Sequence, residues 1–108
     1  MSDSKFGYLL EAEGQIDPSD IVAEVARGFN VYFADVIGDD RRQHIIRARK
    51  LAMAAVRELT DLSLPEIGRL FGKDHTTVMH HVESVKSDLR RSQSLALVIE
   101  RLTQEEAS

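Results

Sequence analysis

Apolar residues recur at intervals of three and four along most of the chain, and no segment shows the two-residue alternation of a half-buried strand. We therefore predict an all-α fold, a compact bundle of about six helices. The expected helices lie near residues 18–33, 36–38, 45–59, 64–71, 75–89 and 95–102. The expected inward-facing side chains of the three central helices are Ala48, Leu51, Ala52, Ala55, Val56 and Leu59; Leu64, Ile67, Leu70 and Phe71; and Val78, Val82, Val85 and Leu89.

Helix-start signals indicate two short helices around a tight turn in the second half of the chain. Ser63, with Glu66 three positions later, predicts a capping box, and Asp74 predicts a second N-cap. The expected turn is Gly72–Lys73, and the second helix then opens with polar side chains up to Thr77. This is the layout of a helix-turn-helix, in which the first residues of the second helix enter the major groove of DNA.

A single domain is expected over residues 17–104, preceded by a flexible arm over residues 1–16 that has no sustained apolar period. Asp17 as a cap and Pro18 at the first helical position mark the start of the domain. The 108 residues include no cysteine and no apolar run of membrane-spanning length. We expect a cytoplasmic, nucleoid-associated protein with no membrane partner.

Charge is distributed unevenly along the chain. The net charge of −4 divides into −7 over residues 1–40 (two basic and nine acidic) and +3 over residues 41–108 (twelve basic and nine acidic). Six basic residues and no acidic residue fall within 41–57. Because such fields fade over roughly 8–10 Å at physiological salt, a basic patch can attract phosphate on an acidic protein. The run indicates a DNA-facing surface, and an ordinary solvated helix face is the alternative.

From about Ile16 to Leu102 the chain resembles the C-terminal DNA-binding domain of the bacterial replication initiator DnaA. The resemblance is carried by the motifs Arg57–Glu58–Leu59–Thr60, Ser63–Leu64–Pro65–Glu66–Ile67–Gly68, Phe71–Gly72 and Asp74–His75–Thr76–Thr77–Val78. It implies binding to double-stranded DNA at DnaA-box-like sites close to TTATCCACA, in the control of replication initiation or transcription.

The resemblance also implies roles for individual residues. Major-groove base contacts are implied for Asp74, His75, Thr76, Thr77 and Pro65, with His81 in place of a methyl contact. Arg41 is implied to enter the adjacent minor groove. Contacts with the DNA backbone are expected from Arg42, Arg49, Lys50, Arg57, Lys73 and Ser63. These roles suit the side chains, because a carboxylate can accept from a cytosine amine and an arginine suits a narrow A·T-rich minor groove.

Some positions depart from the family pattern. Asp39 and Asp40 stand where basic residues are usual, which predicts weaker minor-groove binding by Arg41. Lys50 replaces a more common glutamine and still permits a phosphate contact. The turn before Asp74 is one residue shorter than the form with two glycines, and His81 occupies a position that is usually small. Together these departures predict some drift in the preferred DNA site.

Other functions are disfavoured by the same sequence. His75, His80 and His81 are not spaced to share one metal ion, and no cysteine completes a site. No glycine-rich phosphate loop and no nucleophile with a spaced base is found, so we expect neither a cofactor nor enzymatic activity. A protein-interaction module that keeps the fold is the alternative to specific DNA binding. We expect a stand-alone protein that competes with the host initiator for its sites, or else an excised domain of a longer initiator.

Overall fold

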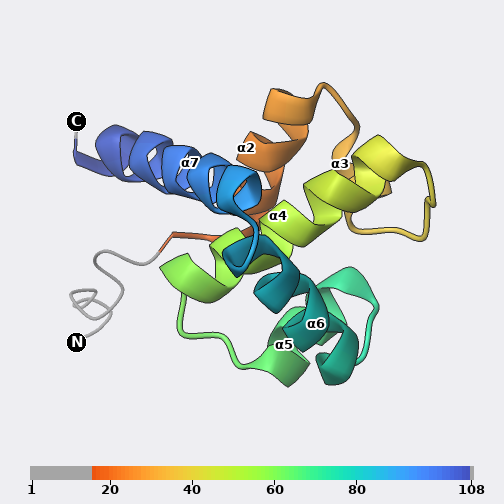
Figure 1. The fold of residues 1–108 in the computed structure, drawn as a ribbon. Coiled ribbons are helices and arrows are strands. Elements are labelled where there is room, and N and C mark those ends of the chain that lie inside the picture. The colour runs from red at the N-terminus through yellow and green to blue at the C-terminus, as the bar shows by residue number, and fades with distance from the viewer. Residues whose placement is uncertain (1–15, 108) are drawn as a thin grey trace.

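The computed structural model describes residues 16–107, which fold into six helices without a strand (Figure 1). The helices are α2 (Pro18–Phe29), α3 (Phe33–Val36), α4 (Gln43–Leu59), α5 (Leu64–Phe71), α6 (His75–Lys86) and α7 (Leu89–Ala107). Helix α4 runs through the middle of the molecule, with α2 and α7 on one side and α5 and α6 on the other. The all-α prediction is confirmed. No helix in this part of the chain combines the length and apolar character needed to cross a membrane.

Small residues make α4 the centre of the core. Ala48, Ala52, Ala54 and Ala55 are fully buried, and α4 packs against the other five helices. Because alanine side chains are short, neighbouring helices can approach the α4 backbone closely. Larger side chains from the surrounding helices complete the core, including Ile21, Val25, Ile67, Phe71, Val78 and Val85.

Local signals set most helix boundaries, as the sequence predicts. The Asp17 side chain accepts a hydrogen bond from the Ser19 backbone N–H at 2.8 Å, which caps α2 beside Pro18. Asn30 ends the helix in the left-handed conformation, with φ of 57°. The short helix α3 spans Phe33–Val36, so it starts three residues earlier than the helix predicted at residues 36–38, and Phe33 belongs to α3 and not to the end of the preceding helix.

The predicted boundary after α6 is wrong. The spacing placed Leu89 on the inward face of α6, but α6 ends at Lys86 and Leu89 opens α7 with 73% of its surface exposed. The break occurs because the Asp88 carboxylate accepts from the Arg91 backbone N–H at 3.0 Å, a capping contact that starts a new helix. As a result α7 starts six residues earlier than predicted.

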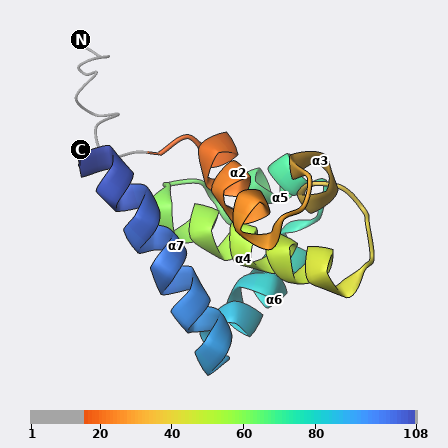
Figure 2. The same ribbon diagram turned by 90° about the horizontal axis from the view of Figure 1, so that it is seen from above.

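An ion pair that includes the buried Glu24 links α7 to α2. The Glu24 side chain is 8% exposed and pairs with Arg27 and, at 2.8 Å, with Arg101 of α7. Ile16 is also buried, so the residue at the end of the predicted arm belongs to the core, while residues 1–15 lie outside the described part. Viewed from above, α7 lies along one side of α4 and the loop between α3 and α4 projects at the opposite edge (Figure 2).

Candidate nucleic-acid interface

Helices α5 and α6 are held together by a close backbone contact at the turn. The Lys73 N–H donates to the Gly68 carbonyl at 2.8 Å, and a Cβ at position 68 would stand 2.3 Å from the Lys73 carbonyl oxygen. Gly72 occupies the left-handed conformation with φ of 66°, which favours glycine. Ser63 and Glu66 form the predicted capping box at the start of α5. These contacts fix the direction in which α6 leaves the turn.

The first turn of α6 presents polar groups to solvent. Asp74 accepts from the Thr77 backbone N–H at 2.9 Å, confirming the predicted cap. That hydrogen bond lowers the pKa of Asp74, so the carboxylate stays ionised at neutral pH. His75 and Thr76 are exposed, and Thr77 is half-buried. A carboxylate, an imidazole and two hydroxyls therefore stand together at one helix end, next to α5.

Pro65 and His81, the other two residues predicted to contact bases, differ in how exposed they are. Pro65 is exposed in the first turn of α5, where its ring is available for an apolar contact. His81 is half-buried on α6, and burial together with the charge of Lys50 lowers its pKa. Because the ordinary pKa of histidine already lies near 6.5, His81 is neutral at pH 7. It therefore adds a polar group but no positive charge.

Three of the predicted DNA-contacting cations are available at the surface. Arg41 is exposed, Lys50 is half-buried, and neither forms an ion pair with a carboxylate among residues 16–104. Arg57 is exposed and donates to the Leu62 carbonyl at 3.1 Å, which positions the guanidinium beside the start of α5. Ser63 is exposed as well, but its hydroxyl accepts from the Glu66 N–H at 3.2 Å and serves the helix cap.

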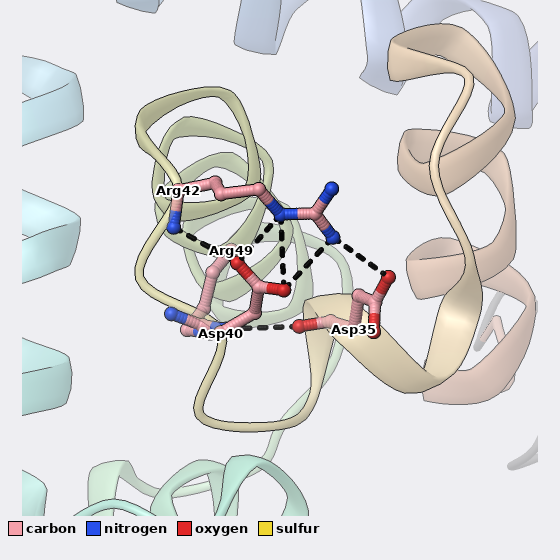
Figure 3. A network of polar contacts seen from close by, with 4 residues as sticks. All are labelled: Asp35, Asp40, Arg42 and Arg49. Atoms are coloured by element: carbon pink, nitrogen blue, oxygen red, sulfur yellow. Dashed lines mark hydrogen bonds and ion pairs between the residues drawn. The ribbon is translucent and has the colours of Figure 1, made fainter.

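Arg49 is not placed as the sequence analysis predicted. It is 5% exposed, and its guanidinium donates to the carbonyls of Val36 and Asp35, each at 2.8 Å. Figure 3 shows this side chain reaching from α4 to the end of α3. Burial lowers the pKa of Arg49, and the nearby carboxylates oppose the shift. Arg49 therefore joins α4 to the last turn of α3, and its buried guanidinium is not exposed for the predicted contact with the DNA backbone.

Two further predicted DNA-backbone cations are held by carboxylates. Arg42 pairs with Asp40 at 2.8 Å and with Asp35 at 3.5 Å (Figure 3). Hydrogen bonds from Arg42 lower the pKa of Asp40 to about 2. Lys73 pairs with Asp39 at 2.6 Å and also donates to the Gly38 carbonyl at 3.4 Å. The sequence identified Asp39 and Asp40 as departures from the family pattern, but it did not reveal their partners.

The pair between Lys73 and Asp39 also has a geometric consequence. It joins the α5–α6 turn to the loop before α4, across 34 positions of sequence. Arg41 follows Asp39 by two residues, so the predicted minor-groove arginine lies on a loop tied to the turn that precedes the first turn of α6. The structure thereby brings the two predicted DNA-contacting segments to one end of the molecule.

In the part of the chain that the structure describes, no cluster of histidines and acids suits a metal ion.

Neutralising Asp39 should strengthen DNA binding. In Asp39→Asn the Lys73 ammonium loses its carboxylate partner and becomes available to a phosphate. One added phosphate contact should steepen the salt dependence by about 0.9, so the affinity gain over wild type should grow by about threefold as salt falls from 200 to 50 mM. The measurement is fluorescence anisotropy of a labelled duplex at several salt concentrations.

The matched control for Asp39→Asn is Glu100→Gln, which removes the same charge from the exposed surface of α7. An equal gain in both variants would mean that net charge, and not release of Lys73, is responsible. Lowering the pH is not a substitute for the mutation, because the hydrogen bond from Lys73, together with its charge, holds the pKa of Asp39 below its ordinary value.

Comparison with known proteins agrees with this geometry. The family model described as "Bacterial dnaA protein helix-turn-helix" matches residues 18–85. The chain is 45% identical over 82 residues to the chromosomal replication initiator protein DnaA of Caldanaerobacter subterraneus subsp. tengcongensis, covering 76% of this chain and 18% of that protein. The DnaA protein of Cutibacterium acnes is 47% identical over 76 residues, covering 69% of this chain and 15% of that protein.

A solved structure has the same fold. It is described as the crystal structure of a DNA replication initiation factor and superposes with a TM-score of 0.74 at 32% identity, covering 82% of this chain and 28% of that one. The fold and the capped, exposed start of α6 thus define a helix-turn-helix domain. The chain belongs to the bacterial DnaA helix-turn-helix family. It spans less than a fifth of the length of these two full-length relatives.

Proposed function

We propose that this chain binds double-stranded DNA sequence-specifically, at DnaA-box-like sites close to TTATCCACA. The observation that carries the proposal is the exposed first turn of α6, which presents Asp74, His75 and Thr76 beside surface cations. In a helix-turn-helix protein this turn enters the major groove. Family membership supports the same role, because the relatives named above are replication initiators.

Base discrimination is proposed for the first turn of α6 and for Pro65. The ionised Asp74 is an acceptor for the cytosine N4 amine, and Thr76 has both a hydroxyl for a base edge and a methyl for thymine. His75 and Thr77 add donors at the same helix end, and His81 lies about one turn beyond Thr77. Pro65 supplies an apolar contact from α5. Together these groups distinguish bases by both hydrogen bonding and shape.

Positioning on the duplex is proposed for the cations around that turn. Arg41, on its projecting loop, enters the adjacent minor groove, whose negative potential is strongest in A·T-rich sequence. Lys50 and Arg57 contact phosphates and fix the register of the domain without distinguishing bases. Lys73 and Arg42 join them only when their acidic partners are displaced, since both are paired in the free protein.

Fluorescence anisotropy with a DnaA-box duplex and a scrambled duplex of the same composition tests the proposal. Specific binding predicts clearly tighter binding to the box, because each mismatched base pair removes about 1–3 kcal/mol. Equal affinity for the two duplexes would contradict specific binding, and no binding to either would favour a protein-interaction module that shares the fold.

Replacing Arg57 should weaken all DNA binding without changing base preference. In Arg57→Gln one phosphate contact is lost, so the slope of log K against log salt should fall by about one unit. The measurement is anisotropy on box and scrambled duplexes over a salt series. A change in base preference with an unaltered slope would place Arg57 at base edges instead.

The proposed biological role is control of replication initiation or of transcription by occupation of such sites. A protein that binds these boxes would compete with the cell's replication initiator for them, because one box holds one recognition helix. We further propose that it acts in the cytoplasm at the nucleoid. Footprinting on origin DNA with and without the initiator tests the competition, which predicts loss of initiator protection as this protein is added.

A further inference from the structure

A second group of cations lies where α4 meets the end of α6 and the start of α7. Four basic side chains line one hollow of about 120 Å³: Arg47, Lys50, Arg90 and Arg91. We call this set the α4–α7 basic cluster. Its apolar lining comes from Phe29, Leu51 and Val85. The mixture suits long basic side chains, whose aliphatic stems pack on apolar surface while their charged ends face water.

The positive charge of this cluster is not neutralised within the described chain. Arg47, Lys50 and Arg90 make no ion pair or side-chain hydrogen bond there. The guanidinium of Arg91 donates only to the neutral Ser84 hydroxyl at 2.6 Å, while its backbone N–H caps α7 through Asp88. By contrast, Arg42, Lys73, Lys86 and Arg101 all pair with carboxylates. Like charges that converge without partners repel one another, and a polyanion placed beside them relieves that repulsion.

The cluster is continuous with the proposed DNA interface. Lys50 belongs to both, and its charge acts on His81 of α6. Val85, in the last turn of α6, lines the hollow itself. A duplex bound at the start of α6 presents its phosphates along the flank of that helix. Arg90 and Arg91 follow the end of α6, so they extend the basic surface away from the base-contacting turn at its start.

We infer that the α4–α7 basic cluster binds backbone phosphates of duplex DNA outside the base pairs that α6 contacts. The inference rests on the proposed function, and it adds a site that lengthens the DNA footprint. The ligand chemistry is the phosphodiester backbone, irrespective of sequence. Guanidinium groups suit it because each can donate two parallel hydrogen bonds to one phosphate.

The test compares two duplexes with the same box, one with about two flanking base pairs on each side and one with about ten. The variant is the double substitution Arg47→Gln and Arg90→Gln, which leaves the apolar lining and Lys50 in place. Wild-type protein should bind the long duplex more tightly and with a steeper salt dependence. Each lost phosphate contact should reduce the slope by about 0.9, or about threefold in affinity between 50 and 200 mM salt.

On the short duplex the double variant should bind like wild type, and on the long duplex it should lose most of the added affinity and slope. Lys86→Gln is the matched control, since it removes a neighbouring positive charge outside the cluster that is already paired with Glu58 at 3.5 Å. It should behave like wild type on both duplexes. Circular dichroism of each variant verifies that the helices are retained.

Two results would overturn the inference. In the first, the double variant gains as much affinity and slope from lengthening the duplex as wild type does. In the second, the variant retains wild-type binding to both duplexes but loses binding to a poly-glutamate peptide, which would assign the cluster to an acidic protein partner. Failure of the proposed function would look different, because wild-type protein would then bind box and scrambled short duplexes equally.

Discussion

Replacing Gly68 with alanine should destabilise the domain and disable the helix-turn-helix. The added Cβ would stand 2.3 Å from the Lys73 carbonyl oxygen, which is backbone and cannot swing aside. Relieving the clash requires α5 and the turn to separate, breaking the 2.8 Å bond from the Lys73 N–H to the Gly68 carbonyl. We expect a loss of about 3 kcal/mol in the free energy of unfolding, measured by urea titration, at the upper end of overpacking effects.

Gly28→Ala is the matched control for Gly68→Ala. Gly28 lies in α2, and a Cβ built there meets nothing within 4 Å. Alanine should therefore stabilise the helix by about 0.5–1 kcal/mol through reduced backbone entropy. Gly28→Ala should bind the box duplex like wild type, whereas the folded fraction of Gly68→Ala should bind it more weakly because α6 is displaced. Equal stability of the two variants would show that the close approach at Gly68 is unimportant.

Asp74→Asn should separate helix capping from base contact. Asparagine is as good an N-cap as aspartate, so stability should change little. Its amide, however, replaces a pure acceptor with a group that also donates, and asparagine pairs best with adenine. We therefore expect affinity for the box duplex to fall by about tenfold to a hundredfold, with the base preference altered at one position. Anisotropy on a panel of single-base variants of the box measures both effects.

Asp17→Asn supplies the control, because it makes the same chemical change at the cap of α2. Both variants lose one negative charge, and a lower net negative charge alone should slightly favour DNA binding. Asp17→Asn should accordingly bind the box at least as well as wild type. If Asp74→Asn does the same, the carboxylate serves only as a helix cap.

Most of the fold could be predicted because the deciding interactions are local in sequence. The caps at Asp17, Ser63 and Asp74 each act within three residues, and all three are observed. The apolar stripe of α4 follows from its period and is buried as expected. The error at Leu89 has a local cause too. Its spacing continues the stripe of α6, while the competing signal is a single capping side chain, Asp88.

The electrostatics of the site could not be predicted in the same way, because its partners are distant in sequence. Arg49 belongs to the basic run in the sequence, yet its guanidinium donates hydrogen bonds to the carbonyls of Val36 and Asp35, which lie 13 and 14 positions earlier. The sequence predicts a phosphate contact for Lys73, but in the folded chain its Nζ lies 2.6 Å from Oδ1 of Asp39. From the sequence, Arg90 and Arg91 are expected at a solvated helix end, and only the packing of α7 places them beside Arg47. The residue types were visible, but their pairing depends on tertiary geometry.

The central claim is that the first turn of α6 selects bases, and binding-site selection from random duplex DNA tests it most directly. Wild-type protein and Thr76→Ala should be taken through the same rounds. The account predicts that wild type enriches one sequence close to TTATCCACA, and that Thr76→Ala enriches the same element with preference relaxed at one or two neighbouring positions. Enrichment of no sequence by wild type, or of an identical and equally sharp sequence by both proteins, would contradict it.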